Sequence, residues 1–459
     1  MSEYTAFCAE DSHSPAFFLK KTLDFGYIRK TQKKSVPASK ISSKVALQLV
    51  RTVRQYFPDI SSRIDRQVTD LRDSRGKVYP MHGAILSVVM MFLLREGSRN
   101  SYNLDREEPR FSRNIRRLLG IRLMHGDAFN EVLCGVDTED LQRLKAVLVR
   151  VLVTRKVFHA YRHNGKYVVA VDGTGTHSLD EDYSGTCLSK TSKTGKESYS
   201  HAVLEAKLVA PNGFCISLAS VWLENNETGQ HDKQDCELAA FKRLADRLKE
   251  LYPRLPMLIV ADALYANAPV METCRTCLWD YMLVMKDGVL KDLGEEIILR
   301  PDRKTGKLPG GSLAYLGDLE HGGHVLSWVF LEEAGNRFSW ITNIRVTGFE
   351  QAVGLTETGR LRWKIENEGF NTQKNLGYNL EHRYSRTDYN AVKNYYQCMQ
   401  IAHLIEQLAL LERTVRKLLA GKVSILKISE RIRNMLVFAN IDPCPINKML
   451  ERKVQIRFE

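Results

Sequence analysis

Apolar residues in the first third of the chain recur at intervals of three and four positions, the spacing that gathers them on one face of an α-helix. Residues 82–97 are almost wholly apolar and predict a buried helix. Residues 129–153 keep the helical period but are interrupted by GVDTED (135–140), which predicts a turn followed by a helix cap. We therefore expect residues 80–155 to be helical.

The pattern changes from residue 166 onward to short β-branched runs separated by turns. KYVVAVDGTGT (166–176) predicts a strand, and residues 201–223 predict a hairpin that turns at Pro211-Asn212-Gly213. Two antiparallel pairings followed by alternating helices and strands are typical of a mixed α/β sheet covered by helices. The alternating elements are predicted at 236–252 (helix), 257–266 (strand), about 268–278 (helix) and 281–286 (strand).

Residues 300–346 contain glycine and proline turns and β-type runs without a helical period, which predicts a β-rich insertion. A further long helix is expected at 387–413. The predicted organisation is a basic helical region for DNA binding or dimerisation (1–155), the first part of an α/β core (160–299), the insertion (300–346), the end of the core (347–412) and a basic helical tail (413–459).

Positive charge is concentrated near the two ends of the chain. The 459 residues carry a formal net charge of +13, from 67 Lys and Arg against 54 Asp and Glu. Residues 20–54 hold ten basic residues and one acid, and residues 411–459 hold eleven basic residues and five acids. These segments are either solvated arms or contacts to a polyanion, of which nucleic acid is the first candidate.

Several classes of protein are disfavoured by the same sequence. It has no apolar run of about 18 residues, so no transmembrane helix and no membrane partner are expected. The first residues lack the form of a signal peptide, which predicts a cytoplasmic protein. The nine scattered cysteines are typical of reduced thiols. Cys274 and Cys277 form a CxxC, but it lies within a predicted helix and has no second pair nearby, which disfavours a zinc site.

Two aspartates follow unbroken apolar runs at the ends of predicted strands. Asp172 follows VVAV, and Asp262 follows LIVA. Each is a turn or cap residue when considered alone; together they predict a carboxylate pair at one edge of the sheet, where α/β proteins bind ligands. Paired carboxylates repel each other unless a cation neutralises them, and oxygen ligands favour magnesium or manganese. A third carboxylate would complete a two-metal site for phosphoryl transfer.

The stretch RLRWKIENEGFNTQK (360–374) offers two glutamates for that third position. On an α-helix, residues four apart share a face, so Arg362, Glu366, Phe370 and Lys374 are expected to lie together. Glu368 lies about 200° around the helix from Glu366. The sequence therefore favours Glu366, although an ordinary amphipathic helix with a surface Glu–Lys arrangement has the same pattern.

VDGTG, IVADALYA and RWKIENEGFNTQK, taken together, resemble the DDE transposases of bacterial insertion sequences. The likeness covers roughly residues 160–412 and is greatest to the cut-and-paste group whose glutamate helix carries a Tyr-Arg-Glu-Lys signature. It implies an RNase H-like mixed sheet with flanking helices and a β-rich insertion. Asp172, Asp262 and Glu366 match the catalytic triad, and Arg362 matches the signature arginine. The signature tyrosine falls on Gly359, and the lysine falls on Gln373, with Lys374 one place later.

The resemblance implies an enzyme with two magnesium ions, replaceable by manganese, held by Asp172, Asp262 and Glu366. It would cut double-stranded DNA at terminal inverted repeats and join the ends to target DNA, as a homodimer in a synaptic complex on the bacterial nucleoid. Arg362 and Lys374 would contact DNA, and Trp328 or Trp340 would stack on an unpaired base unless they are ordinary sheet residues. The residues alone imply only metal-dependent phosphodiester chemistry. A nuclease without strand transfer and a non-catalytic DNA-binding protein are the alternatives.

Overall fold

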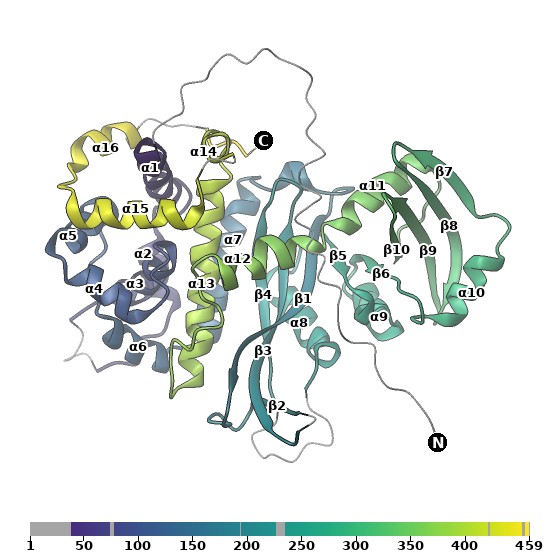
Figure 1. Ribbon diagram of the computed structural model, residues 1–459, viewed down its shortest axis with the longest axis horizontal. Coiled ribbons are helices and arrows are strands. Elements are labelled where there is room, and N and C mark those ends of the chain that lie inside the picture. The colour runs from purple at the N-terminus through teal and green to yellow at the C-terminus, as the bar shows by residue number, and fades with distance from the viewer. Residues whose placement is uncertain are drawn as a thin grey trace, which may run out of the picture. The chain divides into compact units, whose positions relative to one another are not determined.

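The computed structural model describes residues 38–73, 78–192, 194–225, 235–420, 423–451 and 455–458. The first part of the predicted basic arm, residues 20–37, lies outside these ranges. Helices from the two ends of the described chain pack together on one side of the sheet (Figure 1). The helices before the sheet are α1 (Ala38–Tyr56), α2 (Ile60–Gln67), α3 (Met81–Leu93), α4 (Arg99–Glu107), α5 (Pro109–Leu119), α6 (Gly126–Gly135), α7 (Thr138–Thr154) and η3 (His159–Tyr161). Those at the end of the chain are α13 (Tyr389–Leu410), α14 (Arg413–Leu419), α15 (Ile425–Phe438) and α16 (Pro443–Glu451).

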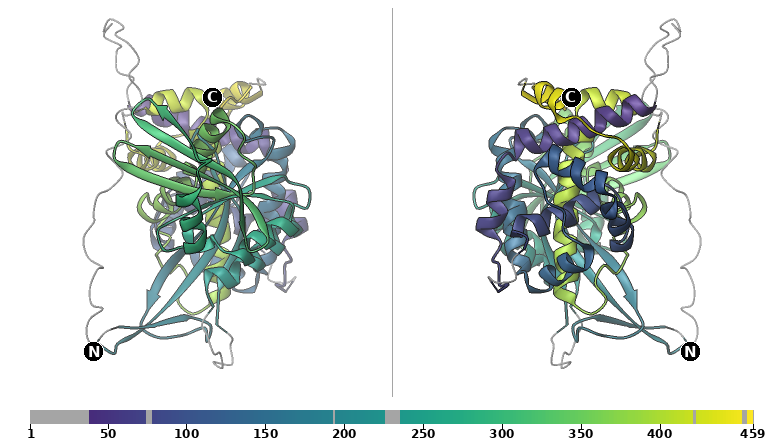
Figure 2. Two further views of the ribbon diagram at one scale, coloured as in Figure 1. Left: turned by 90° about the vertical axis from the view of Figure 1, so that its right-hand side faces the viewer. Right: turned by 90° about the vertical axis from the view of Figure 1, so that its left-hand side faces the viewer.

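Helix α13 is the centre of this helical region. Eighteen of its residues, from Ala391 to Ala409, are buried, because it packs against α1, α3, α6 and α7 as well as strand β4 (Cys215–Leu223). Helix α3 is apolar on all sides and almost entirely buried, as the sequence predicts. The predicted interruption is also present, since Asp137 caps α7 by accepting a hydrogen bond from the N–H of Glu139 at 3.0 Å. Helices α14 and α15 lie beside α1, although they are distant in sequence (Figure 2).

The sheet has ten strands and mixes parallel with antiparallel pairing. Strand β3 pairs antiparallel with β1 and β4, whereas β1, β5 and β6 run parallel to one another. The prediction of a mixed α/β sheet covered by helices is therefore confirmed. Its core strands are β1 (Tyr167–Leu179), β2 (Leu188–Thr191), β3 (Glu197–Val209), β4, β5 (Met257–Ala261) and β6 (Asp280–Val284).

The residues predicted as a β-rich insertion extend this same sheet. Strand β10 pairs antiparallel with β6, and β9, β8 and β7 follow in order. The insertion therefore shares its backbone hydrogen bonds with the core. Its strands are β7 (Lys304–Leu308), β8 (Gly311–His321), β9 (His324–Glu333) and β10 (Asn336–Thr342), and helix α10 (Lys291–Leu299), which the sequence reasoning missed, precedes them.

Helices cover both faces of the core strands. Val168 and Ala170 of β1 pack with residues of α11 (Phe349–Arg360) and of the π-helix η5 (Ile365–Phe370) in one apolar cluster. Because side chains alternate along a strand, Gly173 faces the opposite side, where it meets Glu237 of α8 (Glu237–Leu251). Helix α9 (Ala268–Thr276) packs beside α8 and β6. Within the described residues, no helix combines the length and apolarity needed to cross a membrane.

Candidate active site

Asp172 and Asp262 lie on two neighbouring parallel strands, but only Asp262 follows the end of its strand. The prediction that Asp172 ends its strand is wrong, because β1 continues to Leu179 and Asp172 pairs with Glu205 of β3 inside it. Ala170 of β1 pairs with Val260 of β5, and each stands two positions before its aspartate. The carboxylate of Asp172 accepts a hydrogen bond from the N–H of Gly173 at 3.0 Å. Asp262 caps the short helix η4 (Ala263–Tyr265), and its Oδ1 accepts from the N–H of Leu264 at 2.9 Å. Asp262 is thus a cap residue that also follows the end of its strand, as predicted.

Glu366 reaches Asp172 from a segment where the helix is interrupted. Helix α11 ends at Arg360, residues 361 and 362 form a turn, and the chain continues as the π-helix η5 into α12 (Asn371–Asn375). Arg362 Nη1 lies 2.7 Å from Glu366 Oε1 and 3.7 Å from Asp172 Oδ2, so one guanidinium joins the two acids. Glu368 instead pairs with Lys364, Nζ to Oε1 at 2.6 Å.

The expectation that Arg362, Glu366, Phe370 and Lys374 share a face holds for the first two residues and is wrong for the last two. A π-helix has more residues per turn than an α-helix, so positions four apart no longer coincide. The Glu366 side chain is 50% exposed, whereas Phe370 is buried and its ring lies 5.3 Å from the ammonium of Lys207. Lys374 pairs with Glu381 at 2.9 Å rather than with any of the clustered acids.

Asp172 has the most perturbed environment among the clustered acids. Burial is the main reason that its pKa rises to about 7, and the negative charge of Glu366 adds to the effect. The positive charge of Arg362 opposes the rise, and Glu237 and Asp262 reinforce it. The negative charges of Glu366, Glu237 and Asp262 therefore all act on the carboxyl group of Asp172.

Glu237 is a member of this group that the sequence reasoning did not find. It is the first residue of α8, and its Oε2 accepts a hydrogen bond from the hydroxyl of Tyr265 at 2.7 Å. A Cβ at position 173 would lie only 2.3 Å from Glu237 Oε1, so glycine is required there for the carboxylate to approach β1. Gly173 was a signal in the sequence that another group packs closely against β1. The sequence does not identify that group as Glu237.

Two of the residues proposed to contact DNA are buried in the sheet. Trp328 is 7% exposed and donates from Nε1 to Ser339 Oγ at 2.8 Å, and Trp340 is 3% exposed. Neither ring presents a face for stacking on a base. Trp363, the residue after Arg362, is 40% exposed and contacts Phe338 edge-on, with ring centroids 5.4 Å apart.

Among the described residues, no three His, Cys, Asp or Glu side chains converge closely enough to form a metal-binding group. The acids around Asp172 are the right ligand type for a hard divalent ion, but Arg362 lies between two of them. The Cys274–Cys277 pair is buried on and just after α9 and belongs to no such group. The disfavoured zinc site therefore gains no support.

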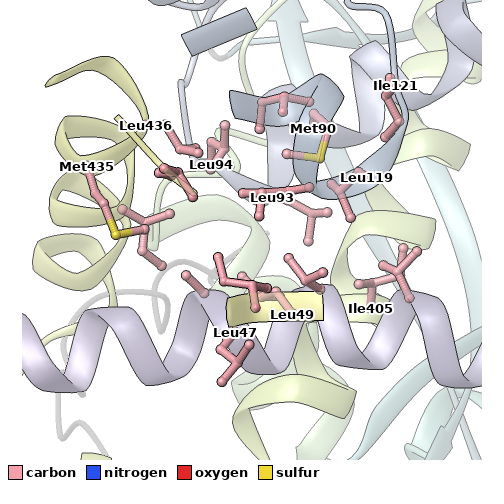
Figure 3. A pocket seen from close by; sticks show the side chains of 18 of the residues that line it. Leu47, Leu49, Met90, Leu93, Leu94, Leu119, Ile121, Ile405, Met435 and Leu436 are labelled. Atoms are coloured by element: carbon pink, nitrogen blue, oxygen red, sulfur yellow. The ribbon is translucent and has the colours of Figure 1, made fainter. Parts of the chain in front are cut away.

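A cavity of about 550 Å³ lies in the helical region, away from these acids. Aliphatic and methionine side chains from α1, α3, α5 and α15 line most of it, including Leu47, Leu93 and Met435 (Figure 3). None of the clustered acids lines it. Without converging polar groups it lacks the features of a catalytic pocket.

Helix α5 carries a ridge of four arginines and no acid: Arg110, Arg113, Arg116 and Arg117. Its opposite face, with Phe111 and Leu118 among others, is buried, and the helix packs on α15. Arg110 and Arg117 donate to the oxygens of Phe438, Asn440 and Ile441, none of them a carboxylate. The described part of the chain supplies no hydrogen-bond or ion-pair partner for the guanidinium groups of Arg113 and Arg116. We call these four residues the α5 arginine ridge.

Comparisons with known proteins supply no family for this arrangement. A scan against protein-family models gave no match, and a search of curated proteins also gave none. The function must therefore be argued from the fold and the site.

Proposed function

We propose that this chain is a DNA transposase with an RNase H-like catalytic core, which cuts the inverted-repeat ends of an insertion sequence and joins them to target DNA. The observation that carries the proposal is that Asp262 and Glu366 both act electrostatically on Asp172, while Arg362 joins Asp172 to Glu366. The three acids are the positions that match the DDE motif of the family that the sequence resembles.

The strand order supports an RNase H-like core. Strands β4, β3 and β1 are antiparallel neighbours, and β5 and β6 continue the sheet in parallel with β1. The resemblance leads us to expect a β-rich insertion just before the glutamate segment. Strands β7 to β10 lie between β6 and α11 in the sequence, at that point of the chain.

The acids are of the ligand type that suits the divalent ions of the proposal, although they do not converge into a compact ligand group within the described residues. Four carboxylates share one region with the single guanidinium of Arg362, and carboxylate oxygens are the ligands that magnesium and manganese prefer. Asp172, Asp262 and Glu366 would hold two such ions, and Glu237 would add negative charge beside them. When bound, the ions would activate water or a DNA 3′-hydroxyl and stabilise the leaving oxygen.

Other residues of the chain would hold the DNA. Arg362 can bind a phosphate through two parallel hydrogen bonds, and its neighbour Trp363 offers an exposed ring to an unpaired base. In this proposal Trp363 takes the stacking role expected of Trp328 or Trp340. The α5 arginine ridge would contact phosphates of the duplex outside the catalytic site. A homodimer would bring the two transposon ends together on the bacterial nucleoid.

The central test compares the two glutamates. Glu366→Gln should reduce magnesium-dependent cleavage of a transposon-end duplex by about a hundredfold or more, because it removes a proposed metal ligand. Glu368→Gln should change the rate by less than about threefold, since Glu368 pairs with Lys364 away from Asp172. Cleavage is measured on DNA taken from both flanks of the coding region. Normal activity in Glu366→Gln would refute the assignment.

Strand transfer separates a transposase from a nuclease. A duplex that already ends in a free 3′-hydroxyl should be joined to target DNA in the presence of magnesium or manganese. Joining that requires Asp172 and Asp262 would support the transposase, whereas cutting without joining would favour the nuclease.

A further inference from the structure

Arg362 occupies a position between two proposed metal-binding carboxylates. A single nitrogen, Nη1, lies 2.7 Å from Glu366 Oε1 and 3.7 Å from Asp172 Oδ2. The arginine side chain is only 12% exposed and that of Asp172 is 18% exposed, so solvent screens their contact weakly, whereas Glu366 is 50% exposed. The guanidinium therefore neutralises part of the negative charge that a divalent ion would neutralise.

A divalent ion and this guanidinium compete for the same oxygens. A metal ion bound to Glu366 and Asp172 would repel a positive charge held within hydrogen-bond distance of either carboxylate. Full coordination by Glu366 also requires the lone pairs that Arg362 engages. Metal binding is therefore weakened for as long as Arg362 stays on the acids. The same contact accounts for acids that interact without forming a compact ligand group.

The backbone around Arg362 places it at a junction rather than inside a continuous helix. The N–H of Leu361 bonds to the carbonyl of Thr358 at 3.0 Å, and the N–H of Arg362 bonds to that of Gly359 at 3.3 Å, which are three-residue spacings. The wider turns of η5 begin at Ile365. Such changes of helix type are common where a helix hinges at a functional site.

We propose that Arg362 is a switch that couples DNA binding to metal binding. A DNA phosphate at the site draws the guanidinium away from Glu366 and Asp172, because phosphate offers it two parallel hydrogen bonds. The freed carboxylates then bind the divalent ions. By linkage, DNA and metal raise each other's affinity by the same factor. The inference rests on the proposed function, since it assumes that these acids bind metal and that the site receives DNA.

The test measures Mn²⁺ binding to the full chain by electron paramagnetic resonance, with and without a duplex taken from the flank of the coding region. Wild-type protein should bind Mn²⁺ about tenfold more tightly once DNA is present. Arg362→Met should bind Mn²⁺ about tenfold more tightly than wild type without DNA, and DNA should then change its affinity less than about twofold. Arg362→Lys keeps the positive charge, so its affinity for Mn²⁺ without DNA should remain as low as that of the wild type.

Lys364→Met is the matched control, because Lys364 and Glu368 form an ion pair at the same four-residue spacing. It should bind Mn²⁺ as wild type does, with the same response to DNA. Equal Mn²⁺ affinity in wild type and Arg362→Met would overturn the switch while leaving the metal site intact. Failure of every variant to bind Mn²⁺, with or without DNA, would overturn the proposed function as well.

Discussion

Asp172 illustrates, at the scale of a single residue, how a buried site couples charge to stability. Its pKa rises from 3.8 to about 7, first through burial and then through the charge of Glu366. The folded chain therefore keeps a proton on Asp172 at pH values where the unfolded chain has lost it. The resulting stabilisation is complete below about pH 4 and is lost as the pH rises towards 7. Above pH 7, ionised Asp172 opposes folding.

We expect Asp172→Asn to stabilise the fold at pH 8 by about 2 kcal/mol, because the amide carries no charge to bury. The gain should shrink as the pH falls and disappear near pH 4, where the wild-type carboxyl is itself neutral. Thermal unfolding of both proteins from pH 4 to pH 8, without divalent ions, measures the difference.

Asp182 provides a control of opposite sign. Burial acts to raise its pKa, but hydrogen bonds from Cys187 and from the N–H groups of Ser184 and Gly185 outweigh burial and hold it below its usual value. Its contribution to stability is present at neutral pH and is lost as the pH falls. Asp182→Asn should therefore destabilise the fold at pH 8. A uniform loss of stability in Asp172→Asn at every pH would contradict the explanation for Asp172.

Helix α11 shows, at the scale of an element, why position 359, where the resembled family has a tyrosine, holds a glycine here. A Cβ on Gly359 would lie 2.7 Å from the indole of Trp340 and 2.8 Å from Met282. The buried Trp340 ring therefore fills the space into which a side chain at position 359 would project. The buried position of Trp340 therefore explains why position 359 holds glycine rather than a larger residue.

Gly359→Ala should destabilise the protein by about 1–3 kcal/mol through overpacking, despite the higher helix propensity of alanine. Gly354→Ala, in the same helix, is the control: its new Cβ would meet only His163, at 3.7 Å, so stability should be unchanged or rise by up to about 1 kcal/mol. Denaturant unfolding measures both. Equal effects at the two positions would contradict the proposed contact with Trp340.

At the scale of the whole molecule, the distribution of positive charge indicates where a polyanion can bind. Arginines paired with a carboxylate differ in this respect from arginines without one. Arg275, for example, is bound twice by Glu272, at 2.6 and 2.8 Å, and its charge is locally compensated. Within the described residues, no carboxylate pairs with the α5 arginine ridge. A net charge of +13 therefore includes at least one helix whose charge faces solvent without an acidic partner. This concentration supports duplex binding more strongly than the total charge does.

The double substitution Arg113→Gln and Arg116→Gln should weaken binding to duplex DNA and lower the slope of log K against log salt by about 2, close to 0.9 for each lost phosphate contact. Arg275→Gln, at a paired arginine, should leave the slope unchanged. Fluorescence anisotropy in EDTA measures binding without cleavage. An unaltered slope in the double variant would exclude the ridge as the DNA contact, and preferential binding to an acidic polypeptide would indicate a protein partner instead.

The sequence by itself determined most of the elements and the strands that carry or precede Asp172 and Asp262, but not that β1 continues past Asp172 to Leu179. Apolar periodicity and β-branched runs follow from local burial, and the parallel pairing of β1 with β5 places each aspartate two residues beyond the paired Ala170 and Val260. Helix α10 and the short strand β2 were not predicted, because neither has a strong local pattern of apolar and polar residues. The identity of the chain as a transposase and the roles of its site residues remain predictions that await the experiments above.

Only the tertiary structure decided how the side chains around Asp172 and Asp262 combine. The π-helix moved Phe370 and Lys374 away from the face of Glu366, and Trp340 proved to be buried against Gly359. Glu237 joined the acids from a helix 65 positions along the chain from Asp172. Such contacts depend on packing between segments that are distant in sequence, and a local pattern of polar and apolar residues does not encode which distant side chains will meet.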